Sequence, residues 1–175
     1  MVGAAGAGSH VKVGKYMSLE KAESAGQGAA FRNIHAGIKV FVLTVNNAVG
    51  AIHGRDGQVV RGNLDAKSGK RESIFASFGV NKAQQFKDKK NTTITIVITN
   101  ADITRSDMKR LGIMAHTSMA STIRPFHTPW DGDTMFVVST QTQKMPKDLS
   151  VSDLGVVTSE LLTQALLRSV AAESY

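Results

Sequence analysis

The amino-acid sequence predicts a single domain of the α+β class, residues 1–175, and three observations lead to that prediction. The chain has 175 residues, of which 42% are hydrophobic, so it is long enough to bury one core. Runs rich in β-branched residues with period-two alternation predict several strands. Two capped amphipathic patterns in the second half predict helices. The order of these elements differs from the regular strand–helix alternation of a parallel α/β sheet.

The strand patterns are separated by turn residues. After a turn expected at Gly26–Gly28, the run from Ile38 to Val45 is the first long strand, and Asn46–Gly50 ends it. Two short strands follow on either side of the Gly54–Gly57 turn, and we expect this region to form a meander. In the strand that begins at Thr92, alternation places three isoleucines on one face and most of the threonines on the other. The expected strands cover residues 38–45, 51–53, 58–61, 92–99 and 134–140.

Two helices are predicted from capping signals and apolar periodicity. The four-residue patterns that begin at Thr104 and Ser150 match capping boxes with Asp in the place of Glu. We expect the first helix to run to about Ile123 and the second to run through about Val170. A third, short amphipathic helix is expected around residues 75–86.

The composition excludes several kinds of protein. With no cysteine, the chain has no disulfide, no thiol nucleophile and no thiolate metal site, which fits a reducing cytoplasm. We expect no membrane association, because no signal peptide pattern and no apolar run of membrane-spanning length is found. The five histidines are scattered without the spacing of a metal site, so we assign no metal and no cofactor.

The net charge of +7 is unevenly distributed along the chain. Residues 61–90 hold eight basic against three acidic side chains, whereas residues 91–175 hold seven against eight. No aromatic side chains interleave with this basic cluster, and no nucleic-acid-binding signature is present. A solvated basic loop is therefore favoured over a groove for phosphates, and no nucleic-acid partner is expected.

The junction of Asn91 and Thr92 is the leading candidate for chemistry. A lysine-rich segment passes directly into a strand here, and Asn tolerates unusual backbone angles. Because the Thr92 hydroxyl lies next to the Asn91 carbonyl, a strained turn would allow this bond to cleave itself. Thr92 would then combine a nucleophile with a base, its α-amine, whose ordinary pKa is about 7.7–8.0. The alternative is an ordinary Thr-rich strand that is preceded by Asn.

Four further side chains are candidates for the same site. Asn47 lies near a strand end and could donate to an oxyanion, although Asn in a turn more often bonds neighbouring backbone groups. Asp131 and Asp133 flank a glycine before a strand, where they either accept from local N–H groups or orient Thr92. A calcium loop is a weaker alternative, because further oxygen ligands are missing. Lys15 is either a surface lysine or one that points into a cavity.

Four blocks of sequence, in this order along the chain, carry a resemblance to a known family. They are Gly26–Arg32, Val59–Ala66, Asn91–Ile94 and Arg124–Thr128, the last followed by Asp131-Gly132-Asp133-Thr134. Together they resemble the L-aminopeptidase/D-esterase family of N-terminal-nucleophile hydrolases over nearly the whole chain. The resemblance is strongest to the branch of this family that hydrolyses nylon oligomers.

This resemblance implies a four-layer αββα sandwich and a precursor that cleaves itself between Asn91 and Thr92. Residues 1–91 would be the end of the α chain, and residues 92–175 would be the β chain. Thr92 would be the nucleophile of the mature protein.

The resemblance also implies roles for the other candidates. Asn47 matches the asparagine that stabilises the oxyanion, and Asp131 and Asp133 match the paired aspartates around the nucleophile. Lys15, in the context Val13-Gly14-Lys15, is similar to the family's active-site lysine.

Family members normally carry a long region before the segment that opens this chain, so the sequence corresponds to the later half of the family's fold. We therefore expect either a homo-oligomer, a tetramer by resemblance, or a partner chain that supplies the missing N-terminal half. The expected substrate is a linear aliphatic amide oligomer that is cleaved through an acyl-enzyme. Short peptides, including β-peptides, are the enzyme alternative. A catalytically silent homologue or a basic binding module is the alternative of a different class.

Overall fold

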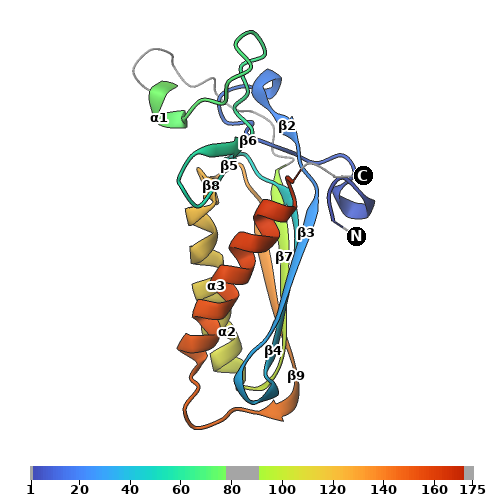
Figure 1. The fold of residues 1–175 in the computed structure, drawn as a ribbon, viewed down its shortest axis with the longest axis vertical. Helices are drawn as coiled ribbons and strands as arrows, with labels where there is room; N and C mark the ends of the chain where they lie inside the picture. The colour runs from blue at the N-terminus through green and yellow to red at the C-terminus, as the bar shows by residue number, and fades with distance from the viewer. Residues whose placement is uncertain (1, 78–90, 172–175) are drawn as a thin grey trace.

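A four-stranded sheet with two long helices on one face forms the body of the chain in a computed structural model (Figure 1). The structure describes residues 2–77 and 91–171. Its strands are β1 Lys12–Val13, β2 Glu23–Ser24, β3 Gln27–Asn33, β4 Lys39–Asn47, β5 Ala51–His53, β6 Val59–Arg61, β7 Thr92–Asp102, β8 Ile123–Arg124 and β9 Thr134–Lys144. Its α-helices are α1 Ile74–Ser77, α2 Arg105–Ser118 and α3 Val151–Arg168. This mixed content confirms the α+β class.

The main sheet has the strand order β3-β4-β7-β9. Strands β3, β4 and β7 are antiparallel neighbours, and β9 joins β7 in parallel. In this register Asn47, the last residue of β4, lies opposite Thr92, the first residue of β7. Two smaller sheets, β1-β2 and β6-β5-β8, lie beyond the end of the main sheet where β7 begins (Figure 1).

The core lies between the main sheet and the two long helices. Helix α3 packs on β3 and β4, and α2 packs on β9 and on α3. Side chains of alternate residues point to opposite faces, so Val97 of β7 and Val42 of β4 are fully buried beneath the helices. The contact between α3 and β3 requires a glycine at position 28. A Cβ there would lie only 1.9 Å from the carbonyl oxygen of Ala165.

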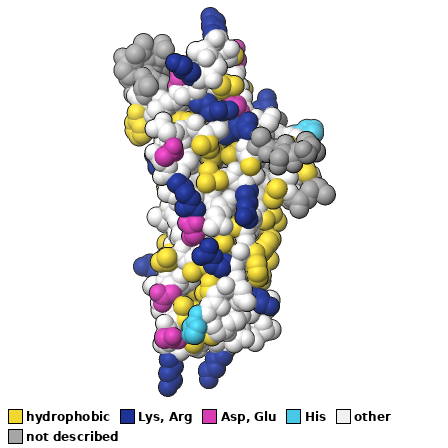
Figure 2. All heavy atoms as spheres, viewed as in Figure 1, with side chains coloured by type: hydrophobic (Ala, Val, Ile, Leu, Met, Phe, Trp, Pro, Cys, Tyr) yellow, Lys and Arg dark blue, Asp and Glu magenta, His cyan; other side chains and the backbone are white. Residues whose placement is uncertain are grey.

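The other face of the main sheet is apolar and exposed. Phe31, Ile94, Phe136 and Val138 are 57%, 50%, 54% and 43% exposed, respectively. We call these four residues the outer apolar face. Figure 2 shows hydrophobic side chains along the side of the molecule where the sheet lies. Contiguous apolar surface of this kind marks a contact face in soluble proteins.

Both predicted capping boxes are confirmed, but the first helix is shorter than predicted. The hydroxyl of Thr104 accepts from the N–H of Asp107, and Ser150 and Asp153 repeat this arrangement. Helix α2 ends at Ser118 and not near Ile123. A 3₁₀ turn follows it, and Ile123 pairs with Ile52 in the small sheet, so tertiary pairing ends the helix early.

Two predictions for the N-terminal half are wrong. The turn expected at Gly26–Gly28 is the start of strand β3, which pairs along its whole length with β4. The expected meander does not form, because β4 joins the main sheet while β5 and β6 belong to another sheet. Of the helix expected around residues 75–86, the structure describes Ile74–Ser77 as helical, and residues 78–86 lie outside the described residues.

Candidate active site

The carbonyl group of Asn91 lies between two donors. The hydroxyl of Thr92 donates to the Asn91 carbonyl oxygen at 2.6 Å, and the N–H of Gly132 donates to the same oxygen at 2.7 Å. Asn91 is only 2% exposed, and it forms a parallel bridge with Asp131. The bond expected to cleave thus has its nucleophile beside it and an N–H group aimed at the oxygen on which negative charge would develop.

Gly132 is a member of this site that the sequence analysis did not identify. It contributes its backbone N–H, and the residue type does not show which backbone N–H groups lie in a site. A Cβ at position 132 would lie 2.9 Å from the hydroxyl oxygen of Thr92, so a side chain there would crowd that hydroxyl. The sequence feature that could have indicated this role is the glycine between Asp131 and Asp133, because a larger residue would not fit beside Thr92.

Lys15 and Asn47 form a hydrogen-bonded pair at the end of β4. The side chain of Lys15 is buried, and its Nζ donates to the backbone oxygen of Asn47 at 2.9 Å and to Asn47 Oδ1 at 2.8 Å. The backbone N–H of Lys12 donates to the same Oδ1 at 3.1 Å. These donors fix the orientation of the Asn47 side chain, directly across the sheet from Thr92.

Asp131 ties together two loops at the site. Its Oδ1 accepts from the N–H of Val49 at 3.0 Å. Its Oδ2 accepts from the N–H and the hydroxyl of Thr128, at 3.1 and 2.7 Å. The two bonds from Thr128 are local, as the first of the two interpretations expects, whereas the bond from Val49 comes from a segment 82 residues away. Asp131 therefore positions the turn that carries Gly132.

Asp133 is a buried carboxylate that contacts Thr93, the residue after Thr92. Its side chain is 1% exposed, and its Oδ1 accepts from the N–H of Thr93 at 2.7 Å. Burial is the largest effect on the pKa of Asp133 and raises it above the ordinary 3.8, and the charge of Asp131 raises it further. The N–H and hydroxyl of Thr93 and the charge of His127 lower this pKa in part.

The five predicted side chains therefore gather where β4 ends and where β7 and β9 begin. Their partners link them in sequence: Lys15 contacts Asn47, Asn47 faces Thr92, and the two aspartates hold the backbone on either side of Thr92. This arrangement fixes their positions, while their chemical roles remain predictions.

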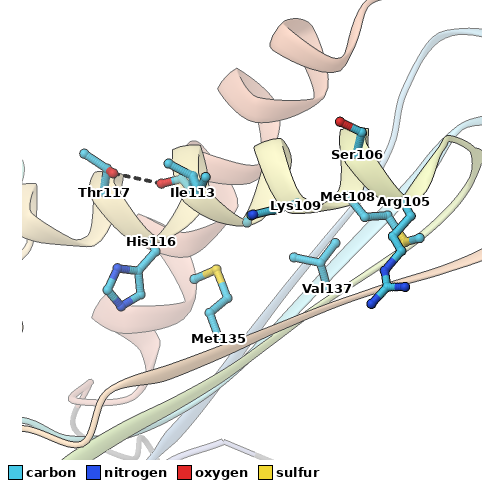
Figure 3. Close-up of a pocket in the computed structure, with 10 residues that line it drawn as sticks. Arg105, Ser106, Met108, Lys109, Ile113, His116, Thr117, Met135 and Val137 are labelled. Carbon is cyan, nitrogen blue, oxygen red and sulfur yellow. Dashed lines mark hydrogen bonds between the residues drawn. The ribbon is translucent and has the colours of Figure 1, made fainter.

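One hollow on the described surface is lined by none of the five candidate residues. It is an open groove of about 1010 Å³ between α2 and β9. Figure 3 shows His116 beside Met135 toward one end of the groove, with Arg105 toward the other. The groove lies on the helix-covered side of the sheet, whereas strand alternation turns Thr92 toward the outer apolar face.

In the described part of the chain, no helix has the length and apolar character needed to cross a membrane.

Comparison with known sequences identifies the family of the chain. The model of Peptidase family S58 matches residues 1–174. A 6-aminohexanoate-oligomer endohydrolase of Agromyces sp. (strain KY5R) is 34% identical over 179 residues, which cover 95% of this chain and 50% of that protein. An uncharacterized aminopeptidase of Mycobacterium bovis is 28% identical over 186 residues, covering 97% of this chain and 52% of that protein. The chain thus spans about half the length of the curated relatives it matches.

Solved structures give the same result for the fold. The L-aminopeptidase D-Ala-esterase/amidase of Ochrobactrum anthropi superposes with a TM-score of 0.62 at 14% identity, over 97% of this chain and 44% of that one. A β-aminopeptidase of Burkholderia superposes with a TM-score of 0.61 at 16% identity, over 96% and 46%. The fold is therefore that of the N-terminal-nucleophile hydrolases, and the described residues supply one helical layer and one sheet layer of it. The chain belongs to peptidase family S58.

Proposed function

We propose that this chain is an amide hydrolase that generates its own N-terminal threonine nucleophile by cleaving the Asn91–Thr92 bond. The observation that carries the proposal is the position of the Asn91 carbonyl oxygen, which accepts from both the Thr92 hydroxyl and the Gly132 N–H. Family membership and the names of the relatives, an endohydrolase and an aminopeptidase, support amide hydrolysis.

Self-cleavage would proceed in two steps. The Oγ of Thr92 attacks the carbonyl carbon of Asn91, and the developing oxyanion is stabilised by the N–H of Gly132. The C–N bond then breaks, the nitrogen of Thr92 takes a proton, and an ester joins Asn91 to the Thr92 oxygen. Water hydrolyses this ester, which leaves a carboxylate at Asn91 and a free amine at Thr92. Residues 1–91 and 92–175 would then be separate chains.

The mature site would use the same groups on an external amide. Oγ of Thr92 attacks the substrate carbonyl, and its α-amine accepts the hydroxyl proton. Asn47 stabilises the oxyanion, a role that its position opposite Thr92 in the neighbouring strand and its hydrogen bond from Lys15 support. The amine leaves, and water hydrolyses the acyl-enzyme. Before cleavage no free amine exists, so Lys15 or an aspartate would assist the first proton transfer.

The first substrate to test is a linear aliphatic amide oligomer of the 6-aminohexanoate type. The relatives named for this substrate are 34% identical, against 28% for an uncharacterized aminopeptidase. Short peptides and β-peptides are the alternative, which the similarity of fold to aminopeptidases supports. Hydrolysis of the linear oligomers without release of N-terminal residues from short peptides would favour the first substrate class, and the reverse would favour the second.

A partner that covers the outer apolar face belongs to this proposal. Ile94 lies two residues after Thr92 on the same side of β7, so the nucleophile stands at the end of this face. The relatives are about twice as long as this chain. We propose that a chain supplying their additional N-terminal half covers the face, with a homo-oligomer, such as a tetramer, as the alternative. A cytoplasmic location also remains a prediction.

Intact mass of the purified protein tests the nucleophile. Wild-type protein should yield two fragments that correspond to residues 1–91 and 92–175, whereas Thr92→Ala should remain a single chain. Thr142→Ala is the matched control, because Thr142 is exposed at the far end of β9. A single uncut chain for the wild type would instead favour a catalytically silent homologue or a basic binding module, for which binding should fall steeply with salt.

A further inference from the structure

One oxygen of the buried Asp133 carboxylate has no hydrogen bond of acceptable geometry among the described residues. Its Oδ1 accepts from the N–H of Thr93, whereas the buried Oδ2 makes no hydrogen bond to a described residue, and the Thr93 hydroxyl, which also makes none, acts on this carboxylate only by lowering its pKa. Burying a carboxylate oxygen without a hydrogen bond costs free energy unless a cation lies close enough to stabilise its charge. The structure places such a group beside it.

The side chain of His127 faces this oxygen. Its Nδ1 lies 3.6 Å from Asp133 Oδ2, which is too long for a hydrogen bond but within the range of an ion pair. The His127 side chain is 54% exposed, whereas that of Asp133 is 1% exposed. The imidazole therefore lies between solvent and the buried carboxylate.

The position of His127 is fixed by its backbone and its neighbours. Its φ is 53°, in the left-handed region that few residues other than Gly, Asn, Asp and His adopt readily. Its ring meets the ring of His116 edge-on with centroids 4.7 Å apart, and the ring of Phe126 lies 5.8 Å away. These contacts present the imidazole to Asp133.

We propose that His127 is a positioning residue for the nucleophile. Its imidazolium holds Asp133 ionised and oriented so that Oδ1 keeps the N–H of Thr93, and Thr93 fixes the backbone of Thr92. The kinetic part of this inference rests on the proposed function, whereas the contact between His127 and Asp133 does not.

Two other ionisable groups, Asp131 and His116, lie near the pair formed by His127 and Asp133. Asp131 raises the pKa of Asp133 through its negative charge. Burial lowers the pKa of His116, as does the neighbouring His127, while Asp133 raises it. Of the two rings, His127 is the one within ion-pair distance of the carboxylate, and its charge lowers the pKa of Asp133.

A titration of the Asp133 side chain by carboxyl ¹³C NMR tests the contact. The measurement is made on Thr92→Ala protein, so that every sample is one uncut chain. The variant is His127→Asn, because Asn also tolerates the left-handed backbone and removes only the imidazole. We expect the Asp133 midpoint to move to higher pH. His35→Asn is the control, since His35 also faces a carboxylate, Asp148 at 3.3 Å, in an exposed position. An unchanged Asp133 midpoint in His127→Asn would overturn the proposal.

The pH dependence of self-cleavage then tests the positioning role. In the otherwise wild-type chain, His127→Asn should slow cleavage roughly tenfold on the acidic side and approach the wild-type rate at alkaline pH, where Asp133 is ionised without help. Equal slowing at every pH would mean a merely structural role and would overturn the proposal. If no protein cleaves itself, the proposed function fails and the positioning role fails with it, while the titration still decides whether the two side chains are coupled.

Discussion

Gly132 donates its backbone N–H to the carbonyl oxygen of Asn91 at 2.7 Å, across the space between the start of β9 and the start of β7. The parallel bridge between Asn91 and Asp131 holds the two segments side by side. Gly132, which follows Asp131, thus supplies the N–H donor, and Thr92, which follows Asn91, supplies the hydroxyl. This backbone arrangement directs both donors to one carbonyl oxygen.

Substituting Gly132 by alanine should block self-cleavage. Its Cβ would lie 2.9 Å from the Thr92 hydroxyl oxygen, so the hydroxyl must move from its present position. We expect at least about a tenfold slower appearance of the two fragments by intact mass, since a 1 Å misplacement costs about a hundredfold. Gly112→Ala, on helix α2, is the control. Cleavage of Gly132→Ala at the wild-type rate would contradict the role given to this contact.

Replacing Lys15 by methionine should slow self-cleavage by about tenfold or more. The substitution removes the amine proposed to assist the first proton transfer, together with its hydrogen bonds to the backbone oxygen and Oδ1 of Asn47, while it keeps most of the buried apolar stem. Lys12→Met is the matched control, because Lys12 is exposed and the substitution keeps the backbone N–H that Lys12 donates to Asn47. If both variants cleave at one rate, the Lys15 side chain has no part in the reaction.

Asp133→Asn should stabilise the fold at neutral pH by about 0.5–2 kcal/mol, as substitutions that relieve a costly functional group commonly do. Burial raises the pKa of Asp133 above 3.8, so the folded state binds this proton more tightly than the unfolded state. The contribution of Asp133 to stability is thus full below about pH 3.8 and is lost as pH rises through the folded pKa. Urea unfolding at several pH values should show a gain for Asp133→Asn that disappears in acid. A gain that grows in acid would reverse this sign.

Glu23→Gln should destabilise the fold by about 1–2 kcal/mol, because it removes the charge from a partly buried ion pair with Arg71. Glu23 accepts from Arg71 at 2.6 and 2.7 Å and from the N–H of Gly62 at 2.8 Å. Burial would raise the pKa of Glu23, but the bonds from Arg71 and Gly62 outweigh it and lower the pKa below 4.5. This stabilisation is therefore present above about pH 4.5 and is lost as pH falls through the folded pKa. Urea unfolding measures both effects, and exposed Glu20→Gln should change neither.

The double variant Phe136→Ser with Val138→Thr should reduce association of the chain with its partner or with itself. Both side chains belong to the outer apolar face and are about half exposed. Light scattering after size-exclusion chromatography measures the mass of the assembly. Phe75→Ser with Val156→Thr is the matched control, since these residues are also exposed but lie on helices α1 and α3. Equal masses for both double variants would argue against the outer apolar face as the contact.

The features predicted well from sequence are those that one segment determines by itself. The capping boxes at Thr104 and Ser150 need only four consecutive residues, and both form as predicted. The short strand at residues 51–53 has the predicted bounds, and Thr92 begins a strand as expected. The candidate side chains were found by residue type, but their convergence required the register of β4, β7 and β9.

The features that sequence did not predict depend on contacts between distant segments. Strand β3 contains Gly28 and neighbouring alanines instead of β-branched residues, because helix α3 packs directly against it at Ala165. Helix α2 ends early because Ile123 is used by β8. The role of Gly132 is carried by an N–H group that every residue except proline has. In each case the determining atom belongs to another part of the chain.

The position of Thr92 within the sheet has a consequence for the handling of the mature protein. A cut before Thr92 would assign β3 and β4 to one fragment and β7, β9 and both long helices to the other, yet β4 pairs with β7 and α3 packs on β3. Native size and shape would therefore stay the same after processing. Unfolding would be unimolecular, but refolding would become bimolecular, so thermal melting that is reversible before cleavage should become concentration-dependent after it.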